Sequence, residues 1–383
     1  MVSSFATQPA GLITGLLLIE IGLTFGVPVG ISGQLRTVSS VVGVFVALLL
    51  GIISVRFSSR SLLLTGSLLL ILSAVGCFIA WDFTSMLILY SLTGVGITMI
   101  TPMINTLIGE NFPQDRRSRI LGLSAAGTSI AYLVCSPLVS YISEMAGWRS
   151  AFLFLMLPVS LLSLVIAFRG IPRSPRDRNS LKISEYLAGF KSVLSNRSAV
   201  FCLLGSMLTW SSFIGSLTYS MSFFREQFLM ALGWASILLS VMALSKTAGH
   251  LTIGTLVSKF GRKNVTVASI LAMALFTLFY FLSEVLWLSV VLVCVSCVLA
   301  GYMHSSVDSL NLEQIPEFRS SMMSLSYAAY TLGGVIGAGL GGFTLIVVGY
   351  RGLGVVLGFL GIVSGVVFYT FAREPEIKEL NAR

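Results

Sequence analysis

The sequence Gly51-Ile-Ile-Ser-Val-Arg56-Phe57-Ser-Ser-Arg60 returns as Gly254-Thr-Leu-Val-Ser-Lys259-Phe260-Gly-Arg262-Lys263, at an offset of about 203 residues. Each copy is a short basic turn between two long apolar segments. The same offset, within one residue, relates Glu110 to Glu313, Pro113 to Pro316, Arg116 to Arg319 and Gly147-Trp148-Arg149 to Gly349-Tyr350-Arg351. A chain that repeats its apolar segments and basic turns in this way is predicted to contain two copies of one membrane bundle. Such repeats are typical of secondary transporters, whose binding site lies between the copies.

The composition also indicates a membrane protein. Apolar residues make up 55% of the 383 residues and charged residues only 10%, whereas a soluble domain carries roughly 25% charged residues. Apolar runs of about 20 residues recur, each long enough to cross a hydrocarbon core of about 30 Å as a helix. We therefore predict an all-α membrane protein with twelve transmembrane helices in two pseudo-symmetric six-helix bundles. The expected spans are residues 10–31, 38–57, 61–80, 84–108, 119–143, 149–169, 199–222, 232–257, 264–283, 285–310, 321–347 and 351–371.

One polar, proline-containing break divides the chain. It predicts an N-terminal bundle over residues 1–170, a cytoplasmic linker over 171–198, and a C-terminal bundle with a short cytoplasmic tail over 199–383. Within the linker, one helical face carries Ile183, Tyr186, Leu187 and Phe190, as in an amphipathic helix lying at a membrane interface. The linker is either a regulatory segment or a simple tether between the bundles.

The basic residues predict the orientation. Most of the 24 lysines and arginines fall in loops on the side of the two termini, and only Arg36, Arg149, Arg225 and Arg351 are expected in loops on the other side. Lys246 lies within a span. Cytoplasmic loops are rich in Lys and Arg, so both termini are expected in the cytoplasm and the protein in a prokaryotic cytoplasmic (inner) membrane. The net charge of +9 is then a topology signal, and no nucleic-acid partner is expected.

The five cysteines do not indicate a cofactor. Cys77, Cys135, Cys202, Cys294 and Cys297 all fall in apolar segments, without a second CxxC pair or a histidine at metal-ligand spacing. The chain has no phosphate-binding Gly-Lys-Ser/Thr loop and no recognisable catalytic constellation. We therefore expect no cofactor, no metal, no ATP-driven step and no enzyme activity.

The repeated turn resembles the signature of the major facilitator superfamily, Gly-x-x-x-Asp-Arg-x-Gly-Arg-Arg/Lys, between its second and third spans. The first copy keeps Gly51, Arg56 and Arg60, with Val55 at the acidic position. The second copy keeps Gly254, Lys259, Gly261, Arg262 and Lys263, with Ser258 at the acidic position. Gly147-Trp148-Arg149 before the sixth span, and Pro113 followed by Arg116, are also similar to that family. The resemblance covers essentially the whole chain, and it implies the two-bundle fold and a conformational role for these turns.

Two motifs of the drug:proton antiporter branch are altered. The arginine expected in the fourth span, four residues before Gly94, is Tyr90. The Gly-Pro-x-x-Gly-Gly run expected in the fifth span reads Ser136-Pro137-Leu-Val-Ser140-Tyr141. The chain is therefore nearest to that branch but carries degenerate versions of its motifs.

Glu20 is a candidate for proton coupling and substrate binding. It lies ten residues into the first expected span, roughly 15 Å deep at helical rise, and that span holds no other charge. Burial disfavours the charged form of a carboxyl group, so Glu20 is expected to exchange a proton or to attract a cationic solute. The alternative is a hydrogen bond to a neighbouring helix.

A second group of ionisable residues is expected in the C-terminal bundle. Lys246 and His250 share one helical face at i, i+4, as do His304 and Asp308. Asn105 occupies the position of Asp308 in the first copy. Asp308, His304 and His250 are candidates for proton coupling, and Lys246 and Asn105 for substrate binding. A Lys246–Asp308 pair would be either a proton relay or anion site, or a fixed ion pair between helices.

Small and aromatic residues complete the candidates. Trp210 and Tyr330 are expected to line the substrate cavity, although aromatic residues also pack membrane helices. Gly333, Gly337 and Gly341 form a stripe at i, i+4 that allows close helix contact, either within one bundle or between bundles.

These observations predict a secondary active transporter that moves a small organic solute by alternating access, with proton-coupled efflux as the leading interpretation. Uptake symport or uniport of an organic solute, including an organic anion, is the alternative, and a transporter-like solute receptor is a weaker one. The expected partners are the lipid bilayer, a small-molecule substrate and protons, and the protein is expected to be a monomer.

Overall fold

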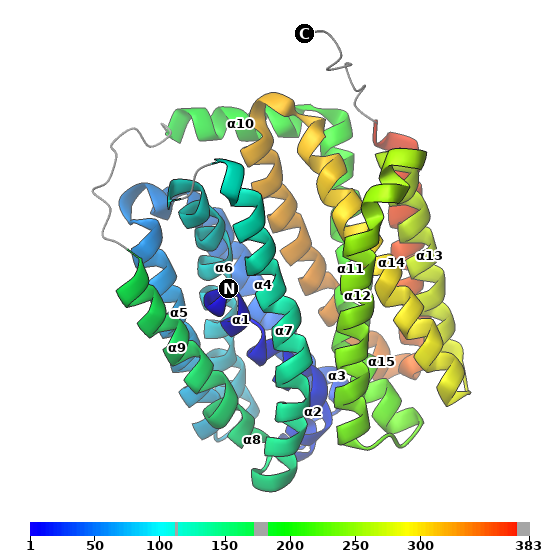
Figure 1. Cartoon of the computed structure of the whole chain (residues 1–383). Helices are drawn as coiled ribbons and strands as arrows, with labels where there is room; N and C mark the ends of the chain where they lie inside the picture. The colour runs from blue at the N-terminus through cyan, green and yellow to red at the C-terminus, as the bar shows by residue number, and fades with distance from the viewer. Residues whose placement is uncertain (112–113, 172–182, 374–383) are drawn as a thin grey trace.

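The chain folds into long helices packed side by side, as the computed structural model shows for residues 1–111, 114–171 and 183–373 (Figure 1). No strand occurs in these residues. The helices before the linker are α1 (Val2–Ala6), α2 (Pro9–Phe25), α3 (Val29–Ser32), α4 (Gln34–Arg56), α5 (Ser59–Ile79), α6 (Phe83–Asn111), α7 (Gln114–Ala146), α8 (Trp148–Ala151) and α9 (Leu157–Gly170), with a π-helical turn at Phe152–Met156. Those that follow are α10 (Ile183–Ser195), α11 (Arg197–Gln227), α12 (Leu232–Phe260), α13 (Arg262–Leu282), α14 (Leu286–Gln314) and α15 (Arg319–Phe371), with a short 3₁₀ turn at Pro316–Phe318.

We call helices α1–α9 the N-bundle and α11–α15 the C-bundle. The linker end is where α9 ends and α11 begins, and the far end is where α11 ends and α12 begins. Helix α10 forms where the amphipathic segment was predicted and lies across the linker end (Figure 1). Its Gly189 packs on Phe318 and Ser321 of the C-bundle. The side chains of Ile183, Tyr186 and Leu187 lie outside the described part of the structure.

Glycines in the left-handed region separate consecutive spans. Gly26, Gly147, Gly261 and Gly349 have φ of 67°, 83°, 81° and 77°, a conformation that side chains with a Cβ adopt at a cost. Gly147 and Gly349 are matched positions of the sequence repeat. Gly349 divides α15 into two spans, so the eleven apolar helices long enough to cross a membrane in the described residues make twelve spans. The predicted fold class is confirmed.

The first span differs from its predicted range of 10–31. Helix begins at Val2, is interrupted near Pro9, and ends at Phe25, because Gly26 adopts the left-handed conformation and Pro28 follows. Glu20 is therefore only five residues from the far end of α2, about 7.5 Å at helical rise. The sequence-based placement of Glu20 near mid-depth was wrong for this reason.

The glycines of α15 serve two interfaces. Gly333, Gly337 and Gly341 pack on α11 within the C-bundle, against Met207, Ser211 and Tyr219 respectively. The other face of α15 contacts α3 and α4 of the N-bundle: Gly334 lies against Ser40 and Gly339 against Thr37 of α4, and Gly342 against Gly30 of α3. Both readings of the glycine-rich span therefore apply, each to a different set of glycines.

The repeated basic turns lie at the linker end. Arg60 donates to the Phe168 carbonyl at 2.6 Å and joins α5 to α9. Lys263 lies 5.8 Å from the centre of the Tyr369 ring and Lys259 5.2 Å from that of Phe260. Gly51 and Arg56 belong to α4, but their side chains lie outside the described residues. The conformational role of these turns stays a prediction.

Candidate functional site

Six of the predicted site residues come together inside the C-bundle. Four of its helices supply them: Trp210 from α11, Lys246 and His250 from α12, His304 and Asp308 from α14, and Tyr330 from α15. We call these six residues the C-bundle cluster. Lys246 lies midway along α12, and Asp308 lies six residues, or about 9 Å, from the linker end of α14.

Asp308 is bound on both carboxylate oxygens. The Tyr330 hydroxyl donates to Oδ1 at 2.5 Å, and His304 Nε2 lies 3.5 Å from Oδ2. The Tyr330 hydroxyl in turn accepts from Asn311 Nδ2 at 3.4 Å, and the same amide nitrogen is 3.1 Å from Ser206 and from Ser326. A polar chain therefore connects Asp308 to the buried interface of α11, α14 and α15. It can redistribute when the carboxyl group gains or loses a proton.

Lys246 takes a different environment. Its Nζ lies 4.5 Å from the centre of the Phe213 ring and 5.6 Å from that of Trp210, so the ammonium is held against aromatic faces. Within the described residues no carboxylate lies within the 4.0 Å ion-pair distance of Lys246. The direct Lys246–Asp308 pair considered from the sequence is therefore not formed, because Asp308 is turned toward Tyr330 and His304.

The two histidines and Trp210 form a contiguous aromatic group. The His250 and His304 rings are 5.1 Å apart, and the His304 and Trp210 rings 4.8 Å apart. His250 Nδ1 is 2.8 Å from the Ser305 hydroxyl. By contrast, His304 Nδ1 and Trp210 Nε1 are buried and have no hydrogen-bond partner in the described part of the chain. Two unpartnered nitrogens in one polar cluster are groups that a bound solute or water can satisfy.

Asn105 is not part of this cluster. It lies on α6 near the linker end of the N-bundle, and its side chain is exposed. Asn105 and Asp308 are matched positions of the repeat. They therefore lie at equivalent places in different bundles and do not share a site.

Glu20 does not stand alone in the structure. Both its carboxylate oxygens accept from the guanidinium of Arg225 on α11, with Nη1 at 2.9 Å from Oε2 and Nη2 in close contact with Oε1. Arg225 Nη1 also donates to the Leu16 carbonyl at 2.9 Å. The ion pair joins the two bundles near the far end. Arg225 belongs to a helix rather than to the loop expected from the sequence.

Other contacts between the two bundles lie along the same interface as the Glu20–Arg225 pair. Helix α7 meets α12 through Ser240, which donates to the Tyr132 carbonyl at 3.3 Å, and through the Ser129 and Thr247 hydroxyls, 3.1 Å apart. Nearer the far end, Gly233 faces Ser140. Together with the contacts of α4 on α15 and the Glu20–Arg225 pair, these interactions hold the bundles together from mid-depth to the far end.

Arg36 is a charged residue that the sequence analysis placed in a loop. It lies within the apolar span Val29–Leu50 and is partly buried. Its guanidinium lies beside Gly11 of α2 and, with Tyr132 of α7, lines a small cavity. Tyr90 bonds to Thr14 and to the Ala10 carbonyl, so Tyr90 and Arg36 both contact the same part of α2.

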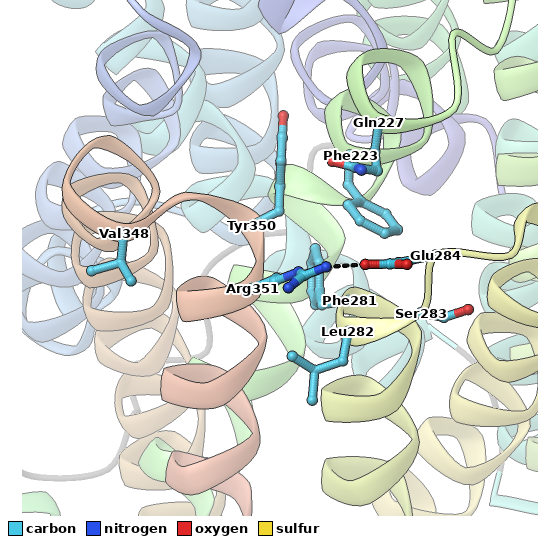
Figure 2. A pocket seen from close by; sticks show the side chains of 9 residues that line it. All are labelled: Phe223, Gln227, Phe281, Leu282, Ser283, Glu284, Val348, Tyr350 and Arg351. Carbon is cyan, nitrogen blue, oxygen red and sulfur yellow. Dashed lines mark hydrogen bonds and ion pairs between the residues drawn. The ribbon is translucent and has the colours of Figure 1, made fainter.

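A pocket at the far surface of the C-bundle lies apart from the C-bundle cluster. Figure 2 shows Arg351 reaching Glu284 across this pocket, beside Phe223, Phe281 and Tyr350. In the N-bundle the repeat-equivalent Arg149 donates to the Ala80 carbonyl at 2.8 Å. Both arginines therefore join the last helix of a bundle to the loop between its third and fourth spans. This equivalence favours a structural role for the pocket residues.

The fold and the site define a polytopic helical protein with two bundles, a polar cluster inside one bundle and an ionic contact between them. The family model of the Major Facilitator Superfamily matches residues 1–310 and 229–383, and the chain belongs to this family of transporters.

Two relatives and one solved structure make the comparison more specific. A probable sugar efflux transporter of Helicobacter pylori (strain P12) is 22% identical over 364 residues, which is 95% of this chain and 91% of that protein. One of Pasteurella multocida (strain Pm70) is 27% identical over 195 residues, 50% of this chain and 47% of that protein. The crystal structure of a D-xylose-proton symporter has a TM-score of 0.79 at 16% identity, covering 97% of each chain, and shows the shared fold.

Proposed function

We propose that this secondary transporter exports a small, hydroxyl-rich organic solute, such as a sugar or sugar derivative, in exchange for protons. The C-bundle cluster is the observation that carries the proposal. It combines a titratable carboxyl group at Asp308 with two histidines and with hydrogen-bonding groups that lack partners. Sugars are recognised by such mixtures of aromatic faces and polar groups, and the rings of Trp210 and Tyr330 are 4.9 Å apart. The names of the relatives support the same class of solute and the direction.

Alternating access gives the two charged regions distinct tasks. The contacts from mid-depth to the far end keep that side closed, and the Glu20–Arg225 pair must break for the site to open there. We propose that the linker end faces the cytoplasm, because Arg60, Lys259 and Lys263 lie at that end and basic residues are enriched in cytoplasmic loops. The structure would then be the cytoplasm-facing state, in which an exported solute enters.

Proton coupling follows from competition at Asp308. In the deprotonated form the carboxylate accepts from Tyr330 and pairs with His304. In the protonated form it needs at most one of these partners, which frees Tyr330 and His304 to bind solute or to repack. Solute binding and protonation therefore act on the same side chains, and this linkage is what an exchange mechanism needs.

The test uses purified protein in liposomes with an imposed pH gradient and with radiolabelled hexoses, pentoses and sugar acids outside. Exchange predicts accumulation of one of these sugars when the liposome interior is acidic, and loss of that accumulation after addition of a protonophore. Accumulation with an alkaline interior instead would indicate symport. If no sugar moves faster than in protein-free liposomes under either gradient, the proposal is wrong.

A further inference from the structure

Arg36 faces a small cavity between the two bundles. The cavity is lined by Gly11, Leu12 and Gly15 of α2, Arg36 of α4, Tyr132 of α7, Leu217 and Met221 of α11, and Leu239 of α12. Residues from both bundles therefore surround the guanidinium. Apart from Tyr132 the other lining side chains are apolar, so Arg36 supplies the charge at this position.

The charge of Arg36 lacks the carboxylate partner that three other arginines in the described residues have. Arg225, Arg319 and Arg351 each pair with a glutamate. For Arg36, no carboxylate lies within the 4.0 Å ion-pair distance in the part of the chain that the structure describes. A cation inside a membrane protein is unfavourable unless water, a counter-ion or a ligand compensates it. The lining offers no anion, which leaves water or an anionic ligand to compensate the charge.

The glycines of α2 let the guanidinium come close to the helix backbone, beside a cavity of about 10 Å³. A Cβ at Gly11 would lie 3.2 Å from Nη1 of Arg36, and a Cβ at Gly15 would meet nothing within 4 Å. At Gly11, where the guanidinium approaches, α2 has no side chain. At Gly15, one helical turn later, the space beside the helix is open. The nearby Tyr90 hydroxyl is occupied by Thr14 at 3.0 Å and by the Ala10 carbonyl at 3.3 Å, so it does not compete for the guanidinium.

We propose that Arg36 binds a single carboxylate group of the transported solute, which is therefore an organic monoanion such as a sugar acid. One planar guanidinium matches one carboxylate with two parallel hydrogen bonds. A phosphate group with two charges would call for a second cation, and none lines the cavity. The inference rests on the proposed transport function, since it takes the space between the bundles as the path of the solute.

The experiment measures binding rather than transport. Purified protein in detergent is titrated with glucuronate, gluconate, glucose and glucose 6-phosphate, and binding is followed by the shift in thermal unfolding temperature. The proposal expects glucuronate or gluconate to bind at least ten-fold more tightly than glucose. Arg36→Gln should abolish this preference, and Arg36→Lys should retain part of it. The matched control Arg197→Gln removes one exposed charge at the linker end and should leave it unchanged.

Several results would overturn the inference. These are equal binding of glucose and glucuronate by the unmodified protein, stronger binding of glucose 6-phosphate, no binding of either sugar acid, or an unchanged preference in Arg36→Gln. If Arg36→Gln does not fold, the inference is tested with Arg36→Lys and by comparing the ligands on the unmodified protein. Proton-driven transport of a neutral sugar that survives unchanged in Arg36→Gln would sink this inference alone. Sugar acids that bind through Arg36 without any proton-driven transport would sink the proposed function alone.

Discussion

Two charged regions of this protein satisfy their ions in different ways. At the far end, Glu20 and Arg225 come from different bundles and form a direct pair with both carboxylate oxygens engaged. Inside the C-bundle, Lys246 and Asp308 belong to neighbouring helices, yet each is bound by uncharged or aromatic groups instead. A direct pair fixes the distance between two helices, whereas separate partners leave both charges available to a ligand. The first region is suited to holding a closed state and the second to binding and coupling.

The largest effect is expected from Asp308→Asn. The amide keeps the size of the side chain and can still accept from Tyr330, but it cannot titrate. We expect accumulation driven by a pH gradient to fall to the level of protein-free liposomes, while folding and exchange of solute without a gradient persist. Glu313→Gln, an acid near the same end of α14 that pairs with Arg319, is the control and should retain driven transport. Normal driven transport by Asp308→Asn would remove Asp308 from the coupling mechanism.

Glu20→Gln should open the far end rather than uncouple transport. The pair is partly exposed, with 26% of the Glu20 side chain and 14% of the Arg225 side chain accessible, so its loss should weaken the closed state by about 1–2 kcal/mol, below the value for fully buried pairs. A loss of about 1 kcal/mol changes the ratio of closed to open states roughly five-fold.

The change can be followed with Ser140→Cys as a reporter. Ser140 is buried where α7 faces Gly233 of α12, and maleimide labelling of the cysteine from the far side should be several-fold faster in the Glu20→Gln background. Glu20→Gln combined with Arg225→Gln should label at a similar rate, since the pair is already broken. Unchanged labelling together with lost pH dependence of transport would instead return Glu20 to the coupling role predicted from the sequence.

Lys246→Met tests whether Lys246 and Asp308 form an ion pair at another stage of the transport cycle. Met preserves the apolar stem, and the ammonium contributes through aromatic contacts of about 0.5–2 kcal/mol, so the single variant should lose at most a modest amount of stability. Combined with Asp308→Asn, it should show a coupling energy below about 1 kcal/mol and no recovery of driven transport. Thermal unfolding and liposome transport of both single variants and the double variant measure this. A double variant that regains stability and transport would show that the two charges pair during the cycle.

The sequence predicted the fold because its evidence was repeated. Two basic turns and two Gly-aromatic-Arg segments at one offset required two similar bundles, and Gly147 and Gly349 indeed share one backbone conformation. The C-bundle cluster was predictable because Lys246 with His250, and His304 with Asp308, share helical faces at i, i+4. Such spacing identifies which face of one helix is charged, but it does not identify partners on other helices.

The partners were missed for a physical reason. The seventh predicted span ended at residue 222, and the second began at residue 38, because charged residues normally lie outside the membrane. Arg225 and Arg36 were therefore assigned to loops. The helices instead extend to Gln227 and begin at Gln34. Arg225 is tolerated there because Glu20 of the other bundle neutralises it, and contacts between bundles leave no spacing signal in the sequence. The structure places both Arg36 and Tyr90 against the same part of α2, which the sequence did not indicate.

His304→Gln and His250→Gln should differ in size of effect. His304 contacts the Asp308 carboxylate and the Trp210 ring. His250 instead forms a hydrogen bond with Ser305 and does not contact that carboxylate. We expect His304→Gln to change the pH dependence of transport measurably and His250→Gln to change it less. Initial rates between pH 5.5 and 8.5 for both variants provide the comparison. A larger effect at His250 would place the proton path along α12 instead of through Asp308.

The smallest effect is expected at Asp82, an acid outside the membrane spans that belongs to neither charged region. It precedes α6, and Ser85 N donates to its Oδ1 at 2.8 Å. Hydrogen bonding from Ser85, through the side chain first and the backbone second, holds the pKa of Asp82 below its ordinary value of 3.8. A depressed folded-state pKa means that the stabilisation is present above the unfolded pKa and is lost as the pH falls through the folded value.

Asn is as good a residue as Asp at a helix start, so Asp82→Asn should keep transport unchanged at pH 7 and only flatten the decline in thermal stability below about pH 4. If the decline below pH 4 is as steep in Asp82→Asn as in the unmodified protein, the acid sensitivity comes from groups elsewhere. The charged regions inside the membrane would then have to be tested for it first.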